Sequence, residues 1–120
     1  MNEVTLTQYH YLMTLRQLSE EMAEVRCIDL AVTLGVARAT TSRMIKSLIE
    51  KGFVFRHHRS LKLSTKGLEL LEKSSQQYKM IYQYFSTMNL NAQEVKECTD
   101  VLVNHLSLQT LQHLCALIKR

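Results

Sequence analysis

The sequence predicts a mainly α-helical protein in which an N-terminal winged helix-turn-helix is followed by an all-helical dimerisation domain. Apolar residues recur at helical spacing along most of the chain, and Gly35 interrupts them between two short helical patterns. Alternating apolar residues between positions 53 and 63 flank a polar turn, which is typical of a β-hairpin. We expect residues 1–66 to form the winged helix and residues 67–120 the dimerisation domain.

The first half of the chain contains three amphipathic helical patterns and the hairpin. Thr7 is a suitable N-cap for the first helix, whose apolar stripe is Tyr11, Leu15, Leu18 and Met22. The second helix carries Ile28, Leu30, Ala31 and Leu34. The third buries Thr41, Met44, Ile45 and Leu48. Residues 53–55 and 61–63 then read as two strands around a tip at 57–60, and a hairpin after such a helix pair indicates a winged helix.

The second half contains three more helical patterns. Ser64 or Thr65 is expected to cap a long helix with the stripe Leu68, Leu71, Ser75, Tyr78, Tyr82 and Phe85. Asn91 with Glu94 fits a capping box that opens a fifth helix, and Ser107 caps a sixth. The fifth helix points Val95, Cys98, Leu102 and Leu106 inward, and the sixth is apolar at Leu111, Leu114, Cys115 and Ile118. Apolar surface beyond the needs of one core predicts a homodimer, with Leu90, Leu102, Leu106 and Leu114 as candidate interface residues.

Charge is concentrated in the predicted winged helix. Residues 26–67 contain nine Lys and Arg against Asp29 and Glu50, a net charge of +7 within a chain whose total is +4. The remainder is therefore acidic, at −3. Clustered cations suit the phosphates of duplex DNA, whereas a lone charged stretch is more often a solvated face. Because the charge coincides with the helix-turn-helix pattern, we expect double-stranded DNA as the partner.

Composition excludes several classes of protein. No apolar run approaches the ~20 residues of a membrane span, and the N-terminus lacks a signal segment, so we expect a cytoplasmic protein without a membrane partner. The three cysteines are too widely spaced for a zinc site or a disulfide framework. No phosphate-binding loop, nucleophile elbow or paired acids are present, so an enzyme is not expected. Each of the three glycines is explained by a turn or a helix end.

The chain resembles the DtxR/MntR metalloregulators over nearly its whole length. The similar segments are Tyr11–Leu12, Asp29–Leu30–Ala31, Leu34–Gly35–Val36, Arg59–Ser60–Leu61, Leu63–Gly67 and Asn104–Ser107. The wing is shared with MarR-type regulators, whereas the C-terminal segment at 104–107 favours DtxR/MntR. The resemblance implies a short, two-domain, MntR-like transcriptional regulator, expected to be a repressor in metal homeostasis.

The resemblance also implies where metal ligands would lie. The family's first-helix ligands fall on His10 and Met13, and those of the later helices fall on Tyr78, Tyr82, Asp100, Val103 and Asn104. Only His10 and Asp100 are ordinary ligands of manganese or iron, so we expect no cofactor. One interpretation is a regulator that has lost metal dependence, in which Tyr78 and Asn104 hydrogen-bond and His10 pairs with Asp100. The alternative is a remodelled site for Mn, Fe or a softer ion at His10, Met13 and Asp100, with Cys98 as a further ligand.

The expected DNA contacts come from the third helix and the wing. That helix is expected to start near Ala37 and to present base-reading side chains, which are Arg38, Ala39, Thr40, Ser42 and Arg43. Arg26 and Lys46 are expected at phosphates, and Arg59 with His57 and His58 at the wing tip. A helix-turn-helix monomer reads few base pairs, so a dimer on a palindromic operator is expected. A protein-binding winged helix is the other class considered, and the basic face of the third helix argues against it.

Overall fold

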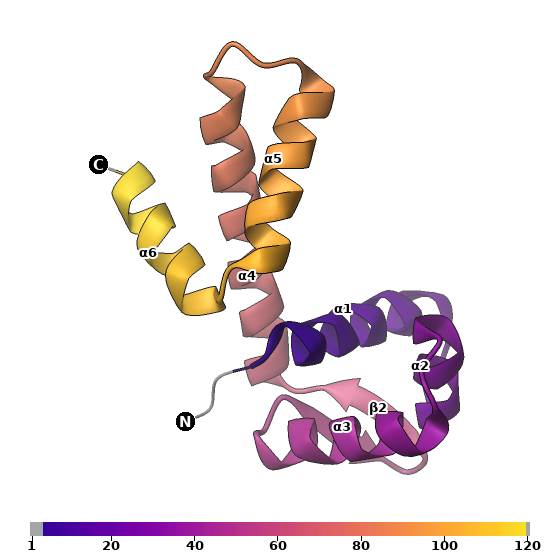
Figure 1. Ribbon diagram of the computed structural model, residues 1–120. Coiled ribbons are helices and arrows are strands. Elements are labelled where there is room, and N and C mark those ends of the chain that lie inside the picture. Colours follow the sequence, from indigo (N-terminus) through magenta and orange to yellow (C-terminus); the bar gives the residue numbers. More distant parts are fainter. Residues whose placement is uncertain (1–3, 120) are drawn as a thin grey trace. The chain divides into compact units, whose positions relative to one another are not determined.

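The computed structural model describes residues 4–119 and is mainly helical, as the sequence predicts (Figure 1). Its elements are α1 (Leu6–Glu21), α2 (Cys27–Leu34), α3 (Arg38–Glu50), β1 (Val54–His57), β2 (Ser60–Leu63), α4 (Thr65–Ser86), α5 (Ala92–His105) and α6 (Leu108–Ile118). Two compact units divide within α4, at Leu71 and Glu72. Among the described residues, no helix is both long enough and apolar enough to cross a membrane.

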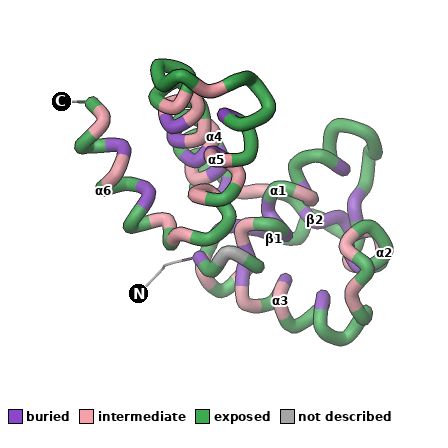
Figure 2. The backbone as a smooth tube through the Cα atoms, turned by 45° about the horizontal axis from the view of Figure 1, so that its top comes forward, coloured by how far each residue is buried: buried purple, intermediate pink, exposed green. Residues whose placement is uncertain are grey.

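The first unit is a helix-turn-helix with an antiparallel hairpin. In it, α1 packs against α2 and β2, while α3 packs against α2 and β1. The core is formed by apolar side chains from every element, among them Leu12, Leu15, Leu30, Ile45, Leu48 and Leu61. Buried residues recur every three or four positions along α3, so the helix keeps one face in the core and one in solvent (Figure 2).

The turn between α2 and α3 depends on Gly35. This residue has φ of +67°, a left-handed conformation that glycine adopts without steric cost, and its N–H bonds back to the end of α2. After it, α3 begins at Arg38 with Ala37 as its N-cap, as expected. Ile28, one of the apolar residues of the second helical pattern, is exposed, and Leu30 and Ala31 supply the buried face of this short helix.

The N-cap of α1 is Thr5, and the expectation of Thr7 was wrong. Thr5 Oγ1 accepts a hydrogen bond from the Gln8 N–H, while the Gln8 side chain accepts one from the Thr5 N–H. Thr7 instead lies inside the first turn, where it is exposed. The reciprocal capping box satisfies two donors at once, which a cap at Thr7 would not.

The hairpin is longer than the sequence suggested. Its register pairs Val54 with Leu63 and continues to His57 opposite Ser60, so both of these residues belong to strands and not to the tip. The turn is reduced to His58 and Arg59, and His58 has φ of +59°. Two-residue hairpin turns require positive φ, which is uncommon for a residue with a Cβ.

The base of the wing is joined to the start of α4. Ser64 is the N-cap of α4, because its Oγ accepts a hydrogen bond from the Gly67 N–H at 3.1 Å, and it also donates to the Gly52 carbonyl at 2.6 Å. Gly67 lies at a helix end, as expected, in the first turn of α4, and it is buried. A Cβ at this position would overlap the carbonyl oxygen of Phe53, and the glycine permits that close approach.

The second unit contains the rest of α4 with α5 and α6. Figure 1 shows α4 and α5 running in opposite directions, joined by residues 87–91. Asn91 with Glu94 forms the expected capping box of α5, and Ser107 caps α6. Ile81, Leu111 and Cys115 form the buried centre of this unit, and the Cys115 thiol donates to the Gln77 carbonyl. The three cysteines are free thiols.

The buried face of α4 differs from the predicted stripe. Leu68 is 49% exposed, whereas Leu71, Ser74, Gln77 and Ile81 are buried. The helix is apolar around much of its girth, so two stripes offset by about one residue compete, and the unit packs the one that contains Ile81. Tyr78 and Tyr82 lie beside this face, half-buried, with their rings stacked at a centroid distance of 6.4 Å.

Two fully buried threonines give a paired test of the helix interiors. Thr41 Oγ1 has no hydrogen-bond partner within residues 4–119, whereas Thr99 Oγ1 donates to the Val95 carbonyl at 2.8 Å. An unpaired buried hydroxyl costs about 1–3 kcal/mol. We expect Thr41→Val to raise the free energy of unfolding by about 1 kcal/mol, and Thr99→Val to lower it by a similar amount. Urea unfolding measures both; a Thr41→Val protein less stable than wild type would contradict the expectation.

Candidate nucleic-acid interface

The solvent face of α3 carries every base-reading residue expected from the sequence. Thr41, Ile45 and Leu48 point into the core and have 0% exposure, which fixes the rotation of the helix. The opposite side chains are therefore all exposed: Arg38, Ala39, Thr40, Ser42, Arg43 and Lys46. The Arg43 guanidinium lies along the helix surface, with Nη2 3.4 Å from Thr40 Oγ1. This contact is long for a hydrogen bond, so the side chain is available to a ligand.

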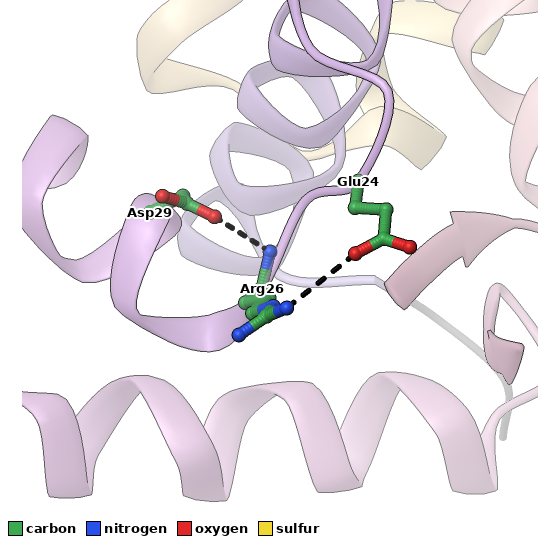
Figure 3. A network of polar contacts seen from close by, with 3 residues as sticks. All are labelled: Glu24, Arg26 and Asp29. Atoms are coloured by element: carbon green, nitrogen blue, oxygen red, sulfur yellow. Dashed lines mark hydrogen bonds and ion pairs between the residues drawn. The ribbon is translucent and has the colours of Figure 1, made fainter. Parts of the chain in front are cut away.

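Arg26 lies at the N-terminus of α2 in a small polar network (Figure 3). Its backbone N–H donates to Asp29 Oδ2 at 2.8 Å, and its guanidinium forms an ion pair with Glu24 at 3.4 Å. Both side chains of the ion pair are half exposed or more, and such pairs contribute at most about 1 kcal/mol. Exchange of Glu24 for a phosphate would therefore cost little, but Arg26 is engaged in the free protein.

The wing is basic along its whole length. Arg56, Arg59 and Lys62 are exposed, and His57 and His58 meet edge to face with ring centroids 4.4 Å apart. Arg56, which sequence reasoning did not single out, lies on β1 with Nη2 4.0 Å from the Cys27 thiol of α2. Its signal in the sequence was the run Arg56–Arg59, in which two arginines flank two histidines.

A backbone hydrogen bond anchors the wing to the segment before α2. The Leu61 N–H donates to the Val25 carbonyl at 2.7 Å, so residues 24–26 run beside β2. This brings Arg26 to the wing side of the helix-turn-helix. The first unit thus places cations on two structural elements, α3 and the hairpin, as a protein that follows a DNA backbone requires.

The positions of the expected metal ligands are divided between the two units. His10 and Met13 lie on α1 and are exposed, whereas Asp100, Val103 and Asn104 lie on α5. Asp100 accepts a hydrogen bond from the Tyr78 hydroxyl at 2.9 Å, so the bond expected between Tyr78 and Asn104 is replaced by one to Asp100. Within residues 4–119 no three His, Cys, Asp or Glu side chains gather at metal-binding distance.

Two features of this region do not suit manganese or iron. Burial, the hydrogen bond to Asp100 and repulsion from the Asp100 charge raise the pKa of Tyr78 above its ordinary value near 10, so the phenol stays neutral at pH 7 and donates its proton. A neutral phenol is a poor ligand for these ions, which favour charged oxygen donors. Val103 packs against the Ile81–Leu111–Cys115 cluster and has no donor atom to offer.

Two of the four residues expected at a dimer interface take part in the second unit's own packing. Leu102 and Leu106 pack against the Ile81–Leu111–Cys115 cluster, and Leu90 and Leu114 are half-buried. The most exposed large apolar side chains of this unit are instead Val101 at 57% and Leu117 at 61%. Tyr84 in the last turn of α4 and Met88 just after that helix are exposed as well.

Comparison with known proteins agrees with this geometry. Residues 4–60 match the model of the MarR family, so the winged helix-turn-helix of the first unit is similar to that of MarR proteins. The transcriptional regulator MntR of Salmonella typhimurium is 24% identical over 102 residues, which cover 84% of this chain and 65% of that protein. The MntR of Lysinibacillus sphaericus is 22% identical over 95 residues, covering 78% of this chain and 68% of that protein. The chain thus spans about two thirds of the length of these relatives.

Solved structures share the fold. A hypothetical protein from Sulfolobus solfataricus, SSo2273, superimposes with a TM-score of 0.78 at 14% identity, covering 96% of this chain and 89% of that one. The metal-dependent transcriptional regulator MtsR superimposes with a TM-score of 0.68 at 21% identity, covering 93% of this chain and 53% of that one. MepR, a transcription regulator of the Staphylococcus aureus multidrug efflux pump MepA, superimposes with a TM-score of 0.60 at 22% identity, covering 92% of this chain and 80% of that one.

The resemblance to DtxR/MntR regulators is supported in part. The sequence relatives are MntR proteins, but the matching family model is that of MarR and not DtxR. The match to the MarR model ends at residue 60, within the winged helix. The segment at 104–107, which favoured DtxR/MntR, therefore lies outside the matched residues.

Proposed function

We propose that this protein, with a MarR-type winged helix-turn-helix at residues 4–60, is a homodimeric, sequence-specific DNA-binding transcriptional regulator that acts as a repressor. The observation that carries the proposal is the two-sided α3. Its core face is completely buried, and its outer face presents Arg38, Arg43 and Lys46 with small residues between them. Long cations next to small side chains allow both hydrogen bonds to guanine and close approach to thymine methyl groups.

The proposal is tested by selecting bound duplexes from a random DNA library with the purified protein. A palindromic consensus is expected, because each protomer of a symmetric dimer reads one half-site. Affinity for that consensus should fall steeply with salt, since phosphate contacts release counterions. If no sequence is enriched, the protein is not a specific regulator. Binding to a protein that persists at high salt would favour an interaction module instead.

We also propose that metal no longer controls DNA binding. The support comes from the Tyr78–Asp100 hydrogen bond, which engages one oxygen of the carboxylate, and from Val103, which packs in the apolar cluster. A regulated site would need several charged ligands at these positions. Two proteins of similar structure are a metal-dependent transcriptional regulator, MtsR, and a manganese regulator, SloR, and the residues at the corresponding site of this chain do not support the same dependence.

Chelator should change the operator affinity by less than about tenfold, or ~1.4 kcal/mol, whereas true effectors couple by about 1–3 kcal/mol. Gel-shift titrations with manganese, and with EDTA, measure the difference. His10→Ala is the matched control: His10 is exposed, so the fold should be unaffected, and the affinity should stay the same in both buffers. Stoichiometric metal in the purified protein, lost in His10→Ala, would establish the remodelled site at His10, Met13 and Asp100.

The homodimer is proposed to form through the second unit. Val101 and Leu117 are more exposed than Leu102 and Leu106, and they extend the proposed interface beyond Leu90 and Leu114, which are half-buried. A second copy of the chain is the partner that a palindromic operator requires. Each protomer must present its α3 to one of two successive major-groove segments on the same face of the DNA.

Leu117→Glu should convert the protein from a dimer of twice 14.0 kDa to a monomer, and operator affinity should fall with it. Light scattering at micromolar concentration measures the mass, and circular dichroism checks the fold. Gln112→Glu adds the same charge to another face of α6 and should leave the dimer intact. A Leu117→Glu protein that stays dimeric would place the interface elsewhere.

A further inference from the structure

The C-terminal end of α3 is tied to α1 by a buried glutamine. Gln8 is 5% exposed, and both the nitrogen and the oxygen of its side-chain amide form hydrogen bonds. Its Nε2 donates to Ser47 Oγ at 3.0 Å, and its Oε1 accepts from Lys51 Nζ at 2.8 Å. The same Oε1 accepts from the Thr5 N–H at 3.1 Å, so the cap of α1 and the last turn of α3 share one acceptor.

A second lysine holds the same helix end from α4. Lys66 Nζ donates to the Lys51 carbonyl at 2.7 Å and lies 4.5 Å from the centre of the Phe53 ring. The Lys51 carbonyl is at the C-cap of α3, where helix carbonyls lack partners within the helix. A cation is favoured there by the negative end of the helix dipole, and the aromatic face adds to the attraction.

Three helix ends therefore meet at residues 47–51, all within the first unit. The start of α1 contributes Gln8, the start of α4 contributes Lys66, and the end of α3 lies between them. Lys51 and Lys66 belong to the basic segment 26–67, yet both ammonium groups donate hydrogen bonds within the protein. Their charge is thus committed to protein contacts, unlike that of Arg43 and Lys46.

We propose that Gln8, Lys51 and Lys66 form a clamp that positions α3 for base recognition; this inference rests on the proposed DNA-binding function. Buried apolar residues fix the rotation of α3, whereas packed helices can still slide slightly along one another. The clamp fixes the axial position through directional bonds to the helix end. Hydrogen bonds to base edges weaken steeply with distance and angle, whereas phosphate contacts tolerate small shifts.

The clamp is tested with Lys66→Met, which keeps an unbranched side chain and removes the ammonium group. Affinity for the selected operator should fall about tenfold, while affinity for a random duplex changes less than about twofold. The slope of log affinity against log salt should stay that of wild type, because no phosphate contact is lost. Lys66→Arg should restore operator affinity, since a guanidinium can also donate to the Lys51 carbonyl.

Lys62→Met is the matched control for a phosphate contact. Lys62 is exposed on β2, and its loss should weaken binding to both duplexes and reduce the salt slope by about one. If Lys66→Met behaves like Lys62→Met, Lys66 contacts phosphate and the clamp is wrong. If Lys66→Met leaves both affinities unchanged, the clamp is equally wrong.

Gln8→Met is the second variant, because it removes the amide from the other side of α3. It should reproduce the selective loss of operator affinity, with folding checked by circular dichroism. Failure of both variants to fold would show a structural role and overturn the clamp. If wild type itself binds operator and random duplex equally, the proposed function fails together with the clamp. Wild-type selectivity that both folded variants retain overturns the clamp alone.

Discussion

Gly67→Ala is expected to lower the free energy of unfolding by about 3 kcal/mol, the largest effect among single substitutions considered for this chain. The added Cβ would overlap the carbonyl oxygen of Phe53 and approach Leu63 Cδ2 to 3.2 Å. The Phe53 carbonyl also accepts from the Ser64 N–H at 3.0 Å, so it cannot move without loosening the base of the wing. Backbone on both sides must shift, which costs more than moving a flexible side chain.

Gly35→Ala is the matched control for this substitution. No atom lies within 4 Å of a Cβ built at Gly35, but its φ of +67° disfavours any residue with a side chain. A loss of about 1 kcal/mol is expected from conformation alone. Urea unfolding should therefore rank wild type above Gly35→Ala and Gly35→Ala above Gly67→Ala. Equal losses would mean that the junction between wing and α4 adapts to the methyl group.

The helices of this protein were predictable because local signals determine them. The apolar spacing, Gly35 and the capping residues at 91 and 107 each act within a few residues of chain. The misplaced cap of α1 had a local signal as well, since Thr5 and Gln8 form the pattern of a capping box, which Thr7 does not. The capping-box pattern of Thr5 and Gln8 is therefore the local signal that identifies the start of α1.

The contacts that define the candidate sites were less accessible to sequence reasoning. Gln8 bonds residues 39 and 43 positions away, and Tyr78 bonds Asp100 across 22 positions. Nothing in the local pattern of a helix indicates such partners. The surroundings of Leu102 and Leu106 were unpredictable for a similar reason. Apolar spacing identifies a stripe but does not say whether the same chain or a second copy covers it.

The outer face of α3 was predictable for the opposite reason. Once Thr41, Ile45 and Leu48 are assigned to the core, helical geometry leaves Arg38, Arg43 and Lys46 outside. The function of that face then depends on its chemistry and not on its packing. Substitutions there should change DNA binding while leaving stability almost untouched.

Arg43→Ala is accordingly expected to lower operator affinity by about 1–3 kcal/mol per half-site without a measurable change in unfolding. Arg43 is exposed, and its side chain makes a long contact with Thr40. If it donates to guanine, the loss should be confined to the operator, and a repeated selection should show relaxed preference at one position of each half-site.

Two controls separate this outcome from a general loss of charge. Arg16→Ala removes an exposed arginine from α1, outside the basic segment, and should leave operator affinity unchanged. Lys46→Ala, one turn further along α3, should weaken all duplexes alike and reduce the salt slope by about one, as a phosphate contact does. If Arg43→Ala also weakens all duplexes alike, Arg43 contacts the backbone, and base recognition must come from Arg38 and the small residues beside it. If operator affinity is unchanged, the outer face of α3 is not the DNA-reading surface.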